Sequence, residues 1–182
     1  AVEGQKIRAL LSWDCGGEYG DWEIRDYGDR MIMPSFIDAH THLFSGAVND
    51  SAFVCSDLGA CRSQEECVEM IRAFADAHPE LERIRGTGWF VGNWGNAALP
   101  DKRLLDEAVG GRPVYLQCAD AHSMWLNTKA LREAKIDPDL QLSDGIICKF
   151  DDGELSGLLL EPSACAPAVE KYMDFTDVEL LE

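Results

Sequence analysis

The sequence predicts a mixed α/β protein, and two observations lead to this prediction. Segments with the apolar patterns of strands alternate along the chain with segments of helical periodicity. The 182 residues are 46% hydrophobic and 27% charged, which is typical of a folded domain with a core and not of a disordered chain. We therefore expect one ordinary domain or two small ones.

The first forty residues are expected to form strands. Residues 6–11 are rich in apolar side chains, and residues 22–25 alternate between apolar and polar. Residues 31–39 form a mostly apolar run, which predicts a strand buried on both faces, as in a parallel sheet or barrel. Pro34 must then lie at the start or the edge of that strand, because proline donates no ladder hydrogen bond.

The rest of the chain is expected to alternate between helices and strands. Ser63 and Glu66 form a capping box at the start of a helix that Pro79 stops, and Asp101 caps a shorter one. A turn at residues 151–153 predicts a hairpin. The expected helices cover roughly residues 64–77, 102–109, 128–135 and 162–173, and the expected strands cover roughly residues 84–90, 114–118, 146–150 and 155–160.

A second capping box, formed by Thr176 and Glu179, lies at the end of the chain. It predicts the start of a helix, but the sequence ends at residue 182, within two turns. A helix this short is only marginally stable in water. We expect a cut in a longer protein here, and the alternative is a frayed end.

The charge of the chain argues against two classes of partner. Sixteen basic and 33 acidic residues give a formal net charge of −17. A surface this acidic repels nucleic-acid phosphates and anionic lipid headgroups. No apolar run reaches the roughly 18 residues that span a bilayer, and the first residues lack the pattern of a signal peptide. We expect a cytoplasmic protein with neither a nucleic-acid nor a membrane partner.

The cysteines agree with that compartment. Their number is odd and no pair has C-x-x-C spacing, so we expect reduced and mostly buried thiols. A structural zinc site formed by Cys55, Cys61 and Cys67 is the alternative, although a spacing of six fits no common zinc template. The seven are Cys15, Cys55, Cys61, Cys67, Cys118, Cys148 and Cys165.

Two histidines follow the apolar run at a spacing that suits metal binding. On a strand, residues i and i+2 point to the same side, so His40 and His42 would present both imidazoles to one cation. Imidazole nitrogens are common ligands of zinc and related divalent metals. Asp38 lies on the same side, where its carboxylate would accept an N–H from a ligating ring and fix the tautomer. The sequence therefore predicts a divalent metal site, with zinc as the first candidate; the alternative is two ordinary histidines at a strand end.

The residues around these histidines resemble a known signature. Residues 33–43, Met-Pro-Ser-Phe-Ile-Asp-Ala-His-Thr-His-Leu, are similar to the P-G-F-I-D-x-H-x-H-L pattern of the amidohydrolase superfamily. Ser35 replaces the usual glycine without touching a ligand. The later segments resemble the branch that includes N-substituted formamide deformylase. They are residues 88–94, 112–116, 121–131 and 153–161, with Ala121 where glycine is usual and Thr128 where serine is usual.

The resemblance implies a fold and its division along the chain. Members have a (β/α)8, or TIM, barrel joined to a β-sandwich, with an α/β region inserted after the first barrel strand. Residues 1–30 would be part of the β-sandwich, and residues 31–60 the first barrel strand with its H-x-H motif and the following loop. Residues 61–175 would be the inserted region, and residues 176–182 the start of a truncated helix.

The resemblance also implies an activity, the hydrolysis of amide-like C–N bonds in small molecules by metal-activated water. His40 and His42 would be the first two metal ligands, while the other ligands and the base would lie on later barrel strands. No catalytic residue can be placed within these 182 residues. Since a barrel takes at least about 200 residues, we expect an N-terminal fragment that is inactive alone, with exposed strand edges that favour a homo-oligomer.

Four further residues are candidates for the substrate pocket. The family match makes His122 a pocket candidate, and the alternative is a structural hydrogen bond. Glu161 follows an apolar strand and would reach the metal region or orient a histidine, unless it only begins a helix. Trp89 and Trp94 would line a cleft or belong to the core. The competing hypothesis for the whole chain is a non-catalytic α/β module that binds a small molecule or a partner.

Two other polar residues are expected to have no functional role. His78 follows a predicted helix and precedes Pro79, so we interpret it as a solvated helix-end residue. Lys149 lies on a predicted strand just before a turn, where a surface lysine is the ordinary interpretation.

Overall fold

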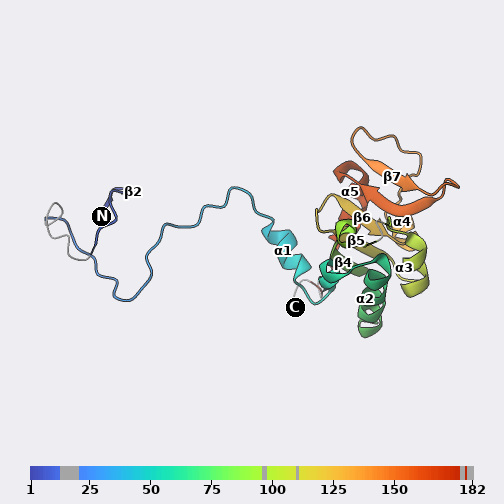
Figure 1. The fold of residues 1–182 in the computed structure, drawn as a ribbon, viewed down its shortest axis with the longest axis horizontal. Helices are drawn as coiled ribbons and strands as arrows, with labels where there is room; N and C mark the ends of the chain where they lie inside the picture. Colours follow the sequence, from blue (N-terminus) through green and yellow to red (C-terminus); the bar gives the residue numbers. More distant parts are fainter. Residues whose placement is uncertain (13–20, 96–97, 110, 177–178, 180–182) are drawn as a thin grey trace. The chain divides into compact units, whose positions relative to one another are not determined.

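The computed structural model describes residues 1–12, 21–95, 98–109, 111–176 and 179, and the chain divides into two units, Ala1–Thr41 and His42–Glu182 (Figure 1). Three predicted features lie wholly or largely outside the described residues: Cys15, the end of the helix after Asp101 at Gly110, and the truncated helix after Thr176. Among the helices that are described, none is both long and apolar enough to cross a membrane.

The described residues of the first unit include a small hairpin. Strands β1 (Val2–Glu3) and β2 (Lys6–Ile7) pair antiparallel, with Val2 opposite Ile7. Gly4 in the turn has a φ of +61°, which glycine adopts without steric cost. The strand predicted over residues 6–11 is thus shorter than expected, and residues 22–25 form no strand. The assignment of this region to a β-sandwich stays a prediction.

The apolar run at residues 31–39 differs from its prediction, because it forms neither strand nor helix. The sequence pattern predicted a strand buried on both faces, yet Phe36 is 89% and Ile37 is 94% exposed. A central strand takes its hydrogen bonds from two neighbours, and neither of the two described sheets includes this segment. Apolar character alone therefore does not make it a strand, and its place in a barrel stays a prediction.

The second unit is built on a six-stranded mixed sheet in the order β3-β4-β5-β6-β8-β7. Strands β3, β4 and β5 are parallel, and the remaining pairs are antiparallel. The sheet is open, and no closed barrel is present among the described residues. The strands are β3 (Val54–Cys55), β4 (Ile84–Trp89), β5 (Val114–Cys118), β6 (Ser123–Leu126), β7 (Ile146–Lys149) and β8 (Leu155–Leu160).

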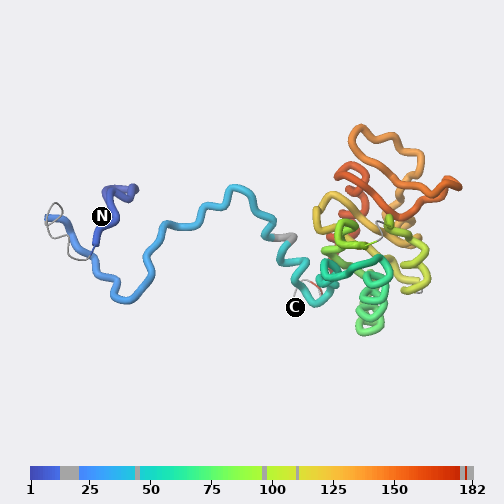
Figure 2. Tube along the Cα trace, viewed as in Figure 1, coloured from blue at the N-terminus to red at the C-terminus, as the bar shows by residue number. Residues whose placement is uncertain are grey.

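Helices cover both faces of this sheet, as the ribbon and the Cα tube show (Figures 1 and 2). Helices α2 and α3 pack on one core and α4 and α5 on the other. Side chains of each strand alternate between the cores, so that Leu116 and Trp125 enter the first and Tyr115 and Met124 enter the second. The helices are α1 (Leu43–Asn49), α2 (Gln64–Ala77), α3 (Lys102–Val109), α4 (Thr128–Glu133) and α5 (Pro162–Tyr172), with 3-10 turns η1 (Asp57–Ala60) and η2 (Val91–Asn93).

Local signals in the sequence explain why these helices begin and end where they do. Ser63 accepts the backbone N–H of Glu66 at 3.2 Å, which confirms the predicted cap of α2. Asp101 accepts the N–H of Arg103 at 2.8 Å at the start of α3. The hairpin of β7 and β8 around residues 151–153 is also confirmed. Strands β3 and β6 and helix α1 were not predicted.

Two arginines, one just before β4 and one within it, contact the end of α5 and the residues that follow it. Arg85, with its side chain 1% exposed, donates to the carbonyls of Tyr172 and Asp174 and to Oε1 of Glu179 at 2.7 Å. Arg83 pairs with Glu133 and Asp174. Glu179 also accepts the N–H and hydroxyl of Thr176, so the predicted capping box is formed and is anchored on the sheet.

The carboxylate of Glu179 gains stability from these contacts. Burial favours its neutral form, but hydrogen bonds from Thr176 and the charge of Arg85 outweigh that effect, so the pKa of Glu179 lies below its ordinary value of 4.5. A carboxyl whose pKa is lower in the folded state stabilises the fold above its unfolded pKa. That contribution is lost as the pH falls through the folded pKa.

We predict that Glu179→Gln lowers the free energy of unfolding at pH 7 by about 2 kcal/mol, because a hydrogen-bonded charged partner of buried Arg85 is removed. Chemical denaturation at pH 7 and at steps down to pH 3 measures this, and the difference from the unmodified chain should shrink toward acid. Glu107→Gln, in an exposed part of α3, is the control and should change stability little. Equal effects of the two substitutions would contradict the prediction.

Candidate functional site

The structure brings together two of the predicted pocket residues, His122 and Glu161. Strand β6 begins at Ser123 and β8 ends at Leu160, and these two residues are paired in the antiparallel ladder. The residue before one strand and the residue after the other are therefore neighbours. The backbone N–H of Glu161 donates to the carbonyl of His122 at 2.7 Å, and Nδ1 of His122 lies 3.1 Å from Oε2 of Glu161.

The side chains of the pair face solvent, while hydrogen bonds hold the backbone of His122 in place. The side chains of His122 and Glu161 are 59% and 52% exposed, so both are accessible to a ligand. Asp120 accepts the backbone N–H of His122 at 2.8 Å. The thiol of Cys165 donates to the carbonyl of His122 at 3.5 Å, and burial raises the pKa of that thiol to about 12, which keeps it protonated. The roles of Asp120 and Cys165 were not predicted, and that of Cys165 depends on a contact between residues 43 positions apart.

Two residues at this site have a strained backbone conformation. Ala121 has a φ of +60° and Glu161 a φ of +68°, a conformation that side chains with a Cβ rarely adopt. Each such residue costs free energy and persists only where its surroundings fix it, most often at functional sites. The sequence held one signal of this, because Ala121 stands at a position where the resembling family has glycine.

The pair also lies at the edge of the sheet where ligands usually bind. The parallel strands β3, β4 and β5 end there, and β6, which runs antiparallel to β5, begins there. Ligands of open α/β sheets bind beyond the carboxyl ends of the parallel strands. The structure thus places His122 and Glu161 beyond the carboxyl ends of the parallel strands, where ligands of such sheets usually bind.

The two tryptophans proposed for the pocket lie in the core of the second unit. Trp89 is 1% and Trp94 is 5% exposed, and their rings are 6.0 Å apart at the centroids. Trp125 packs edge-on against both. Trp89 donates its indole N–H to the carbonyl of Leu116 at 3.0 Å. These positions match the alternative interpretation as core aromatics, and a pocket role for them stays a prediction.

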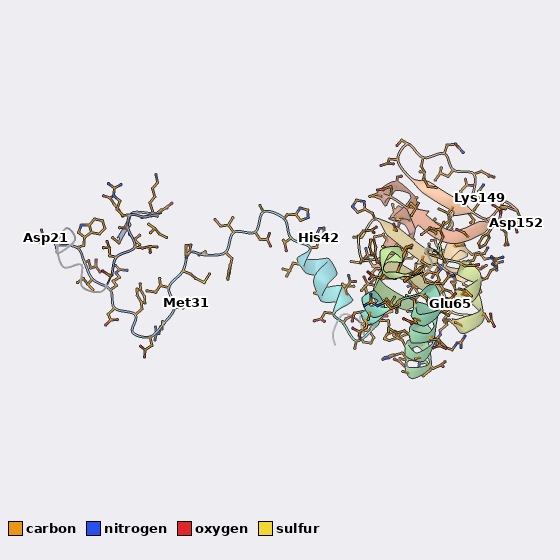
Figure 3. The ribbon with its side chains drawn as sticks, viewed as in Figure 1. Asp21, Met31, His42, Glu65, Lys149 and Asp152 are labelled. Atoms are coloured by element: carbon orange, nitrogen blue, oxygen red, sulfur yellow. The ribbon has the colours of Figure 1, made fainter. Side chains whose placement is uncertain are left out.

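The H-x-H motif follows the apolar run described above. His40 belongs to the first unit, while His42 is the N-cap of α1 in the second (Figure 3). Asp38 was expected to accept an N–H from a histidine ring, and here its carboxylate accepts the backbone N–H of His40 at 3.0 Å. This contact folds residues 38–40 into a tight bend. The metal role of His40 and His42 and the orienting role of Asp38 stay predictions.

The residues expected to have no function lie as predicted. His78 is the C-cap of α2, where Nδ1 lies 3.0 Å from Glu80 and the ring packs at a tilt of 35° against Phe74. Lys149 lies at the end of β7 with its ammonium 3.2 Å from Asp139.

The described cysteines are free thiols, and all but Cys148 are buried. Burial raises the pKa of Cys55 to about 11 and also raises that of Cys67. A zinc site formed by Cys55, Cys61 and Cys67 gains no support, because no three such side chains among the described residues are grouped to hold a metal ion.

The described residues do not assemble a complete metal centre. Among the described residues, no three His, Cys, Asp or Glu side chains are grouped so that they could hold a metal ion. A catalytic zinc usually has three protein ligands and one open position. The two imidazoles of the H-x-H motif have the right donor chemistry, but they are fewer than such a centre needs.

Comparison with known proteins assigns the family. The sequence model of the amidohydrolase family matches residues 23–181, which is most of the chain. The chain belongs to the amidohydrolase family. The matched range includes the H-x-H motif, Arg83 and Arg85, and both members of the His122–Glu161 pair.

Several curated relatives are similar to this amidohydrolase chain. The putative amidohydrolase YtcJ of Bacillus subtilis is 27% identical over 95% of the chain and 34% of its own length. N-substituted formamide deformylase of Arthrobacter pascens is 27% identical over 82% of the chain and 28% of its own length. Protein LONG AFTER FAR-RED 3 of Arabidopsis thaliana is 29% identical over 78% and 24%, respectively. The chain thus spans about a quarter to a third of these relatives.

Solved structures of two metal-dependent hydrolases have a similar fold over most of this chain. An uncharacterized metal-dependent hydrolase from Pyrococcus furiosus has a TM-score of 0.52 at 23% identity, over 81% of this chain and 27% of that one. A similar protein from Pyrococcus horikoshii also has a TM-score of 0.52, at 22% identity. The predicted fold class, a mixed α/β chain similar to metal-dependent hydrolases, is confirmed.

We predict that Ala121→Gly stabilises the protein. Glycine adopts a φ of +60° without the cost of roughly 1 kcal/mol that a Cβ incurs, which outweighs its greater freedom in the unfolded chain. Thermal or chemical unfolding measures the gain, which should be a few tenths of a kcal/mol. The same substitution at Ala73, an exposed position inside α2, is the control and should destabilise by about 1 kcal/mol. A loss of stability in both variants would show that Ala121 is not strained.

Proposed function

We propose that this chain is part of a metal-dependent hydrolase that acts on amide-like C–N bonds in small molecules. The observation that carries the proposal is the match to the amidohydrolase family over residues 23–181, which includes His40 and His42. The deformylase relative, by its name, acts on N-substituted formamides. The free thiols of the described cysteines support a cytoplasmic location as part of the same proposal.

His40 and His42 would hold a divalent metal ion, with zinc the first candidate, and Asp38 would orient one of the rings. A bound metal of this kind lowers the pKa of a water molecule to near 7 and polarises a carbonyl group. Since the described residues provide fewer donors than a catalytic zinc needs, the 182 residues alone are proposed to bind metal weakly and to be inactive.

The His122–Glu161 pair would contribute to the substrate pocket. An ionised carboxylate can only accept hydrogen bonds, so the contact with Glu161 places the ring proton on Nδ1 of a neutral His122. Nε2 of His122 then presents a lone pair to solvent at the carboxyl edge of the sheet. An N–H of an amide substrate is a suitable donor for that lone pair. In this role His122 binds the substrate, and Glu161 positions His122.

A non-catalytic binding module is the second candidate function. One observation favours it, namely that the described residues contain an exposed polar pair but no group that could hold a metal. In that case the chain would bind a small molecule or a partner through the same sheet edge, and exposed strand edges would favour a homo-oligomer. The two experiments below separate these candidates.

We predict that His40→Ala/His42→Ala weakens Co²⁺ binding to the chain at least tenfold, because it removes both proposed imidazole ligands. Co²⁺ is a useful probe because its absorption spectrum distinguishes imidazole from thiolate ligands. The chain offers a matched control in its other two histidines, so His78→Ala/His122→Ala should leave binding unchanged. Equal losses in both double variants, or a thiolate spectrum, would remove the support for the H-x-H site.

We predict that the protein expressed from its complete reading frame hydrolyses N-substituted formamides when a divalent metal is supplied. His42→Ala should abolish turnover, whereas His78→Ala at the end of α2 should leave it intact. The 182-residue chain should show no turnover under the same conditions. Turnover by the complete protein that survives His42→Ala would contradict the metal role, and the absence of any turnover would favour the binding module.

A further inference from the structure

A groove of about 600 Å³ lies at the other ends of the strands that carry the His122–Glu161 pair. It is lined by the first residue of α3, one side of α4 with the turn that follows it, and the residues that lead into β8. Thr128 follows the end of β6 and Leu155 begins β8, so the groove and the pair lie at opposite edges of the sheet. Its volume is within the range of small-molecule sites, roughly 300–1,000 Å³.

The lining combines an apolar surface with positive charge. Leu131, Ile136 and Leu155 supply apolar side chains, while Lys102, Arg132 and Lys135 supply cations. One carboxylate, that of Glu154, also lines the groove and lies 3.6 Å from the ammonium of Lys102. Three cations against one anion give this groove a local positive charge, in a chain whose formal net charge is −17.

The charges of Arg132 and Lys135 are not neutralised by the protein. Within the described part of the chain, neither side chain forms an ion pair, and both are exposed. Asp106 contacts Thr128 of the lining, and its two oxygens already accept the N–H and the hydroxyl of that residue at 2.9 and 2.6 Å. An anion in the groove would therefore find available donors.

Local constraints in the backbone place two of these cations. A Cβ at Gly157 would lie 2.3 Å from the carbonyl oxygen of Leu126 and 2.7 Å from Cβ of Lys102, so only glycine lets α3 approach β8 this closely. That approach buries all but 6% of Lys102. Lys135 has a φ of +52°, one of three positive values among the described residues other than glycine. Lys135 follows the C-cap of α4, where a left-handed residue commonly ends a helix, and this ending fixes the backbone from which its side chain extends.

We propose that this groove binds a small organic anion, namely a carboxylate with an apolar body. The apolar side chains would contact the body of the ligand, and Arg132 and Lys135 would bind its carboxylate, with Arg132 able to do so through two parallel N–H bonds. This site is independent of the proposed hydrolase function, because it uses other residues at the other edge of the sheet.

The test is a titration of the chain with hexanoate, followed by backbone amide chemical shifts in NMR. Saturable shifts are expected at Ile136 and Leu155, with a Kd on the order of 1 mM, and they should weaken as sodium chloride is raised. Hexylammonium, which has the same number of carbon atoms and the opposite charge, should bind at least tenfold more weakly. Acetate, which lacks the apolar body, should also bind at least tenfold more weakly.

A pair of variants with the same change of charge completes the test. Arg132→Gln/Lys135→Gln should weaken hexanoate binding at least tenfold, and both side chains are exposed, so the fold should persist. Arg62→Gln/Arg72→Gln, which removes two exposed cations elsewhere, should leave binding within twofold of the unmodified chain. Equal weakening in the two double variants, binding of hexylammonium as tight as that of hexanoate, or the absence of saturable shifts would overturn the proposal. Even if a variant misfolds, hexanoate binding to the unmodified chain that does not weaken as sodium chloride is raised would contradict the proposal.

Discussion

Backbone hydrogen bonds between β6 and β8 hold together the residues on which both candidate sites depend. Their register places Ser123 opposite Leu160 and Trp125 opposite Leu158. One end of this ladder joins His122 to Glu161, and the other end brings Thr128 to the residues that lead into β8. A slip of one residue would exchange the two faces of a strand and move every buried side chain to the wrong core. The alternation of Leu158 and Leu159 between the two cores fixes the register against such a slip.

Strands β6 and β8 meet because the sheet changes direction after β5. The parallel half, from β3 to β5, follows the rule that strand and helix alternate, whereas β6, β8 and β7 add an antiparallel half. A parallel sheet alone would present only strand ends of one kind at each edge. The mixed arrangement places the start of β6 beside the end of β5. The residues that lead into β6 therefore lie at the carboxyl ends of the parallel strands, where ligands of α/β sheets bind.

Much of this architecture could be predicted from local patterns. Helix α2 was predicted from its capping box and periodicity, and the hairpin of β7 and β8 from its turn residues, because these signals lie within a few positions of one another. The short strands β3 and β6 carry too few residues to show a period. The segment at residues 31–39 has the composition of a buried strand, but a strand also requires neighbours that a local pattern does not reveal.

In the candidate sites, too, local patterns identified single residues but not the contacts between residues far apart in the sequence. His122 and Glu161 were both predicted as candidates, yet their contact joins residues 39 positions apart in the sequence. Arg85 and Glu179, 94 positions apart, gave no sequence signal at all beyond the capping box. The tryptophans show the opposite case, in which residue type suggested a cleft and packing placed the rings in the core.

The exposed apolar side chains of Phe36 and Ile37 bear on how this chain behaves in solution. Exposed apolar surface promotes self-association, while a net charge of −17 keeps copies apart through mutual repulsion. Added salt screens the repulsion and strengthens apolar contact, and acid near the isoelectric point of about 4.5 removes the charge itself. Dilute buffer at neutral or alkaline pH is therefore the condition in which molecules of this chain stay separate.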